Sequence, residues 1–89
     1  MKTIFKYPLS PGGSRIDMPA GAQVLCAREQ GDVICVWALV DTDAGAQVRT
    51  FQALRTGQEV PGRPDLHYLG TALLPGGIAF HVFEEPDAS

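Results

Sequence analysis

The stretch Gln23–Asp41, which reads QVLCAREQGDVICVWALVD, decides the fold. Its second half, Val33–Val40, has no polar residue and is bounded by Gly31-Asp32 and by the polar run that starts at Asp41. An apolar run this short between turn residues is typical of a buried strand, because buried helices are normally longer. We therefore predict a β-hairpin whose second strand lies at the centre of the fold and is covered on both faces.

The turn of this hairpin sets the neighbours of its cysteines. With Gln30-Gly31 as the two loop residues, Gly31 takes the positive φ of a type I′ turn. This register places Cys26 opposite Cys35 in a non-hydrogen-bonded pair, where side chains come closest. A redox switch is one reading of such a pair, but thiols in apolar strands usually serve as small hydrophobic residues. We expect reduced thiols in a set of core or interface residues: Cys26, Cys35, Trp37 and Phe80.

The other segments predict further short strands. Ala46–Arg55 reads as a strand with a bulge or bend near Arg49-Thr50, and a short amphipathic helix is the alternative because three apolar residues are spaced by three. The remaining predicted segments are an edge strand at Thr3–Tyr7 ended by Pro8, an extended segment at Arg15–Met18, and a second hairpin formed by Leu66–Leu74 and Gly77–Phe83. The prediction is one all-β domain over residues 1–89 with an acidic tail at 84–89: a small antiparallel meander, sandwich or half-open barrel of five to seven strands.

The composition limits the possible partners. Apolar residues make up 45% of the chain and charged residues only 19%, so we expect a homo-oligomer that buries part of the apolar surface. The net charge of −3 argues against duplex DNA as a partner. No apolar stretch approaches the roughly 20 residues of a membrane helix, so we expect no membrane partner and a cytoplasmic location.

The residues that carry chemistry are sparse. No serine stands in a nucleophile motif, and Asp32, Asp41 and Asp43 lie at hairpin ends, where aspartate commonly forms turns. We therefore predict no catalytic residue and no enzyme activity. Two cysteines cannot complete a zinc site by themselves. His81 is predicted opposite Thr71, which leaves His67 about 13 Å further along its strand. We therefore expect no metal and no cofactor.

The longest irregular segment, Thr56–Asp65, is the predicted location of a ligand site. Guanidinium groups beside a glycine-containing turn can bind a phosphate or a carboxylate, although solvated surface arginines are the alternative. The candidate ligand-binding residues are Arg49, Arg55, Thr56, Gly57, Gln58 and Arg63.

Several motifs along the chain carry a family resemblance: PAGAQVL, CVWALVD, RTGQ, YLGT and FHVFEE. Together they resemble a family of small uncharacterised proteins of phages and bacterial prophages, over about Thr3 to Glu85. Members often have a histidine after the Thr-Gly pair, where this chain has Gln58. The resemblance implies no established activity and no catalytic residues.

This resemblance implies a non-catalytic binding protein, located in the host cytoplasm if a phage encodes the chain. Small phage proteins of this kind frequently act against host defence, by inhibiting a defence protein or by sequestering a small anionic or nucleotide ligand. The expected partner is therefore a host protein, which an edge strand would recognise, or a small anionic ligand. The alternative function is a structural or assembly accessory that acts by self-association.

Overall fold

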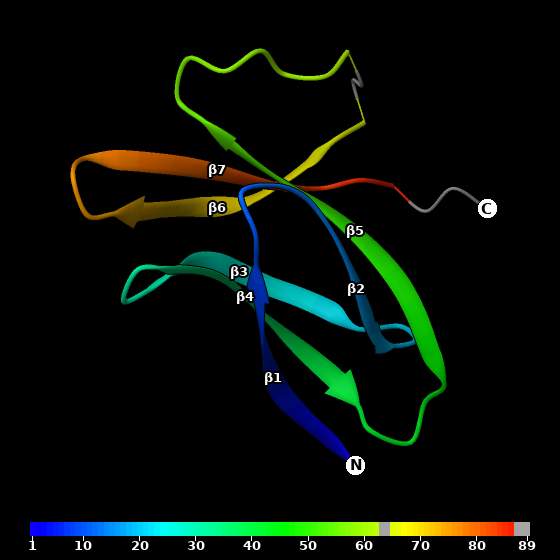
Figure 1. The fold of residues 1–89 in the computed structure, drawn as a ribbon. Helices are drawn as coiled ribbons and strands as arrows, with labels where there is room; N and C mark the ends of the chain where they lie inside the picture. The colour runs from blue at the N-terminus through cyan, green and yellow to red at the C-terminus, as the bar shows by residue number, and fades with distance from the viewer. Residues whose placement is uncertain (63–64, 87–89) are drawn as a thin grey trace.

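The computed structural model describes residues 1–62 and 65–86, which form seven strands joined by turns and loops, with no helix among these residues (Figure 1). The strands are β1 (Lys2–Leu9), β2 (Gly12–Pro19), β3 (Gln23–Gln30), β4 (Val33–Asp41), β5 (Ala46–Arg55), β6 (His67–Leu74) and β7 (Ile78–Glu84). Accordingly, no helix of the described residues is long and apolar enough to cross a membrane.

All strand pairs are antiparallel and belong to two sheets. Sheet A has the order β1-β4-β3, and sheet B has the order β2-β5-β7-β6. The sheets pack face to face without closing into a barrel, as Figure 1 shows. The all-β prediction is confirmed, as are the central position of β4 in its sheet and the strand at Ala46–Arg55, which excludes the alternative helix.

The covering of β4 differs from the prediction. On its inner face Ile34, Val36, Ala38 and Val40 are all buried against sheet B. On its outer face Cys35 is buried, whereas the flanking positions remain partly exposed. The expectation that β4 is covered on both faces is therefore wrong for most of the outer face, because sheet B covers sheet A from one side only.

The hairpin register also needs correction. The two loop residues are Gly31-Asp32, and only Gly31 has a positive φ, of 63°, which fits a type II′ turn with glycine at its first central position. Cys26 therefore lies opposite Trp37 and not opposite Cys35. The register then shifts at a β-bulge between Val24 and Cys26. Both thiols are free.

The predicted irregularity near Arg49-Thr50 has another cause. Strand β5 pairs with β2 from Ala46 to Ala53 without a register shift, so it contains no bulge there. The alternation slips because Arg49 faces the interior, where it pairs with Glu84, while Val48 faces solvent. Bulges lie instead in β3 and β6.

The sheets approach each other most closely where β3 lies beside β6. A Cβ built on Gly70 would lie 2.3 Å from the Ala27 carbonyl oxygen, so only glycine fits this contact. Two residues further along β3, the Glu29 carboxylate accepts a hydrogen bond from the backbone N–H of Leu73 at 2.9 Å. This side of the sandwich is closed, which leaves β1 and β2 as the free edges among the described strands.

Candidate functional site

Arg49, one of the predicted ligand residues, is engaged inside the sandwich. Its guanidinium forms a two-pronged ion pair with Glu84, with Nη2 to Oε1 at 2.9 Å, and its Nη1 donates to the Ala22 carbonyl at 2.7 Å. The two side chains are only 18% and 15% exposed. Arg49 therefore ties β5 and β7 to the turn before β3, and this geometry serves the fold.

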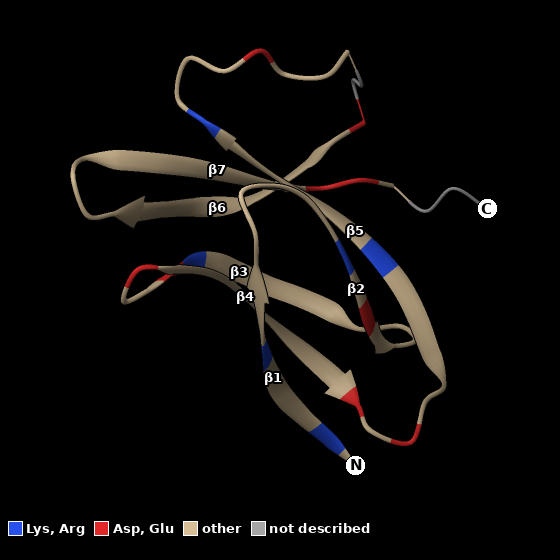
Figure 2. Ribbon diagram, in the orientation of Figure 1, with Lys and Arg blue, Asp and Glu red and all other residues tan. Residues whose placement is uncertain are grey.

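The other predicted residues lie around the turn that follows β5. The Gln58 N–H donates to the Arg55 carbonyl, and the Arg55 N–H donates to the Gln58 side chain, both at 3.0 Å. Gly57 allows this turn with a φ of 88°. Figure 2 shows the basic residues spread over several strands and not gathered at the long loop. Arg63 lies outside the described residues.

The structure adds a polar row that the sequence analysis did not single out. Thr56 Oγ1 lies 2.7 Å from His81 Nε2, His81 Nδ1 lies 3.2 Å from Thr71 Oγ1, and the Thr71 hydroxyl meets the Tyr68 hydroxyl at 2.6 Å. The predicted pairing of His81 with Thr71 is confirmed and was the signal for this row. Because a hydroxyl and not a carboxylate holds Nδ1, the row lacks the group that stabilises an imidazolium in a catalytic triad.

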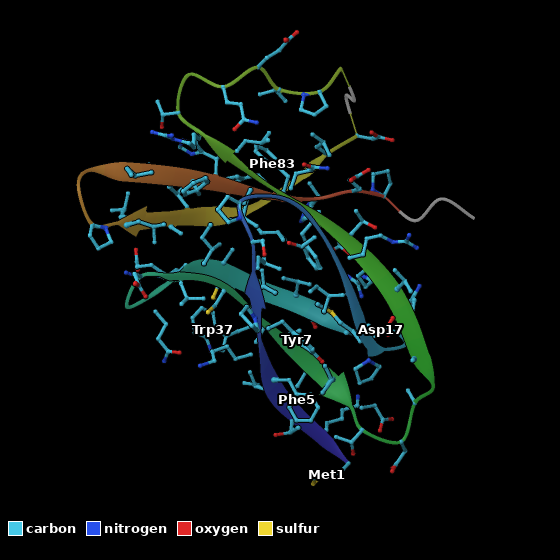
Figure 3. The ribbon with its side chains drawn as sticks, in the orientation of Figure 1. Met1, Phe5, Tyr7, Asp17, Trp37 and Phe83 are labelled. Carbon is cyan, nitrogen blue, oxygen red and sulfur yellow. The ribbon has the colours of Figure 1, made fainter. Side chains whose placement is uncertain are left out.

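The outer face of sheet A carries a second surface, centred on Trp37. Trp37 lies between Lys6 of β1 and Cys26 of β3, and the adjacent row joins Ile4 to Leu39. Trp37 and Leu39 are half-buried, and Ile4 is 55% exposed. In Figure 3, Trp37 lies on the side of sheet A away from β6 and β7. We call this surface the Trp37 face; it comprises Lys2, Ile4, Lys6, Cys26, Arg28, Trp37 and Leu39.

Basic groups surround the apolar centre of the Trp37 face. Strand pairing places Lys2, Lys6 and Arg28 on it, although the whole chain has a net charge of −3. The carboxylate at its end, Asp41, has a lowered pKa because it accepts a hydrogen bond from the Asp43 N–H and a second from the N-terminal ammonium group. Asp41 is thus ionised and its charge is balanced by the ammonium group, while Arg28 lies 3.5 Å from the Glu29 carboxylate. Lys2 and Lys6 make the β1 side of the face locally basic.

A small pocket of about 130 Å³ opens at the same end of sheet A. Its lining includes Lys2, Gly21, Gln23, Leu39 and Asp41. A pocket of this size beside an exposed sheet face has room for one protruding side chain of a partner and not for a larger ligand.

Strand β1 forms one side of the Trp37 face, and no other described strand pairs with its outer edge. The Thr42 N–H donates to the Met1 carbonyl at 2.8 Å, so the odd-numbered residues of β1 form the hydrogen-bonded pairs with β4. The N–H groups of Lys2, Ile4 and Lys6 therefore point away from β4. Pro8 has the same parity, which explains why β1 continues through Pro8 where the sequence analysis ended it: its missing N–H faces the free edge.

Comparison with known proteins places the chain in a family. Residues 1–89 match the family described as Domain of unknown function (DUF7352). The chain belongs to the DUF7352 family. The predicted membership of an uncharacterised family is thereby confirmed, over residues 1–89 of the chain. No curated protein and no solved structure matches the chain.

Proposed function

We propose that this DUF7352 domain is a non-catalytic binding protein that docks a protein partner on the Trp37 face. The proposal depends on the position of Trp37, half-buried at the centre of a three-stranded sheet face that no other strand of the described residues covers. Tryptophan is enriched among the residues that contribute most of the binding energy in protein interfaces. Such residues are typically surrounded by contacts that add little energy themselves but exclude water. Ile4 and Leu39 supply such contacts beside the indole.

The charges of this face define the partner. A surface with an apolar centre and a rim of Lys2, Lys6 and Arg28 fits a partner with an apolar patch and an acidic rim. The resemblance to small phage and prophage proteins supports a host protein, such as a defence component, as that partner. Inhibition would follow from occupation of the partner's own binding surface.

The alternative ligand, a small anion near the loop after β5, has less support. Arg49 is held by Glu84 and by the Ala22 carbonyl on the interior side. Arg55 lies opposite Phe80, which faces the core, whereas Thr56 bonds to His81 on the outer face. Because these side chains diverge, they do not form a convergent set of donors for one phosphate or carboxylate.

Affinity capture with matched variants tests the proposed surface. The tagged wild-type domain, Trp37→Ala and Leu73→Ala are each incubated with lysate of the source cell, and the retained proteins are identified by mass spectrometry. Leu73 is the control because it is an exposed apolar residue on sheet B. We expect an acidic protein that wild type and Leu73→Ala retain and that Trp37→Ala loses at least tenfold.

The same capture experiment can refute the proposal. Circular dichroism first establishes that the Trp37→Ala variant is folded. Equal retention by all three folded proteins would place binding elsewhere. So would a ligand that Trp37→Ala retains and that Arg55→Ala or His81→Ala loses. Native mass spectrometry of the domain purified from its source cell would reveal a retained nucleotide directly.

A second candidate function is assembly by self-association. The free edge of β1 favours it, because unpaired backbone groups on an exposed strand are a template for another strand. Self-association would use the backbone edge of β1, whereas partner binding would use side chains on the outer face of sheet A, so the two are compatible.

A further inference from the structure

We infer that two copies of the chain pair through β1, antiparallel, with Phe5 opposite Phe5 of the second copy. This pairing joins two three-stranded A sheets into one continuous sheet. The inference concerns self-association at the edge and does not depend on the identity of any partner bound to the Trp37 face.

The backbone of β1 is available for this pairing. Among the described residues, β4 is the only strand that β1 contacts extensively. The outward N–H and C=O groups belong to Lys2, Ile4, Lys6 and, for the carbonyl alone, Pro8. An added strand would hydrogen-bond to these alternate residues, as in strand addition to any exposed sheet edge.

The lysines of β1 select one register. Centring the pair on Ile4 puts Lys2 directly opposite Lys6 of the second copy, and centring it on Lys6 puts the two Lys6 residues opposite each other. Like charges directly opposite are destabilising. Centring it on Phe5 sets Lys6 opposite Ile4 and Lys2 opposite Pro8, and larger shifts pair fewer residues.

The aromatic side chains favour the same register. Phe5 is 42% exposed, and its ring meets Tyr7 edge to face with centroids 6.3 Å apart. Because the Phe5 N–H points toward β4, two facing Phe5 residues form a non-hydrogen-bonded pair, in which Cα atoms lie about 4.5 Å apart. Aromatic cross-strand pairs stabilise sheets, and this one would remove two exposed phenylalanines from water.

The symmetry has a structural consequence. The two-fold axis of an antiparallel pair of identical strands is perpendicular to the sheet, so both Trp37 faces lie on the same side. The dimer would therefore present two copies of the basic apolar surface to a partner. A partner with two acidic sites would bind with increased avidity.

Charge reversal at Phe5 tests the register. We expect the wild-type mass in sedimentation equilibrium to rise with concentration from 9.5 kDa toward twice that value. Phe5→Glu alone and Phe5→Lys alone each place like charges opposite each other and should remain at 9.5 kDa. An equimolar mixture should restore the dimer, since Glu then faces Lys, and this recovery also shows that both variants are folded.

Disulfide trapping gives a second measurement. Phe5→Cys should form a covalent dimer under mild oxidation, because a non-hydrogen-bonded pair has the Cα separation that a disulfide needs. Thr3→Cys is the matched control, since position 3 would face Tyr7 of the second copy. Wild type controls for Cys26 and Cys35.

Three results would overturn the inference. The first is a wild-type mass of 9.5 kDa at every concentration. The second is a mixture of folded Phe5→Glu and Phe5→Lys that stays monomeric, combined with Phe5→Cys trapping no better than Thr3→Cys. The third is a monomeric wild type from which Phe5→Glu removes a captured partner, which would assign the edge to that partner.

Discussion

At the scale of single residues, Gly70 marks the closest contact between the two sheets. A methyl group at this position would press on the Ala27 carbonyl oxygen from 2.3 Å, and neither backbone can move far inside a packed sandwich. We predict that Gly70→Ala lowers the free energy of unfolding by about 1–3 kcal/mol or more. Urea unfolding measures this change. Gly45→Ala is the control, since nothing lies within 4 Å of its built Cβ, and an equal loss there would contradict the explanation.

The Arg49–Glu84 pair makes a second prediction at this scale. Removing one partner of a largely buried ion pair leaves the other charge uncompensated, so Arg49→Ala should cost about 3 kcal/mol of stability. Arg55→Ala, at an exposed position of the same strand, should change stability by less than about 0.5 kcal/mol. A double-mutant cycle with Glu84→Ala separates the pair from the lost side chain. If Arg49→Ala were as stable as Arg55→Ala, Arg49 would have a ligand role instead of a structural one.

Glu29 links stability to pH. Its pKa is lowered from 4.5, chiefly because the carboxylate accepts the Leu73 N–H and, to a lesser extent, because Arg28 is nearby. The ionised form therefore stabilises the fold above pH 4.5, and this contribution is lost as the pH falls through the lowered pKa. We predict that Glu29→Gln loses less stability than wild type between about pH 5 and pH 3 in urea titrations. The control is Glu59→Gln, in an exposed loop. If Glu29→Gln lost as much stability over this pH range as wild type and the control do, the prediction would be wrong.

At the scale of elements, the parity of β1 predicts opposite effects of proline at adjacent positions. Ile4→Pro removes only an N–H that faces the free edge, so stability should stay within about 1 kcal/mol of wild type. Phe5→Pro removes a bond to β4 and should cost about 1–3 kcal/mol more than Phe5→Ala. Thermal unfolding at a concentration where the mass is monomeric measures both. The reverse order of effects would show that the parity of β1 is misassigned.

At the scale of the whole molecule, the uneven distribution of charge predicts how a partner associates. The basic rim of the Trp37 face should attract an acidic partner, so raising the salt from about 0.05 M to 0.5 M should slow association roughly tenfold or more. Arg28→Ala should weaken this salt dependence, and Arg15→Ala, on sheet B, should not. Surface plasmon resonance with the captured partner gives the rates. A salt dependence that responds only to Arg15→Ala would place the interface on sheet B.

Local pattern in the sequence determined the strand content of this protein. The apolar run at Val33–Val40, the alternation around Phe80 and the glycine and proline turns specify an all-β domain, because these signals depend on near neighbours alone. The same local logic identified β1 as an edge strand and the pairing of His81 with Thr71.

Only the tertiary structure decided which face each side chain uses. The one-residue difference in the hairpin loop separated Cys26 from Cys35, since register depends on turn geometry and on packing of both faces. It also decided that Arg49 is engaged by Glu84, a residue 35 positions away, and that half-buried Trp37 lies on a sheet face that no other described strand covers. Such contacts join residues distant in the chain, so no local pattern could specify them.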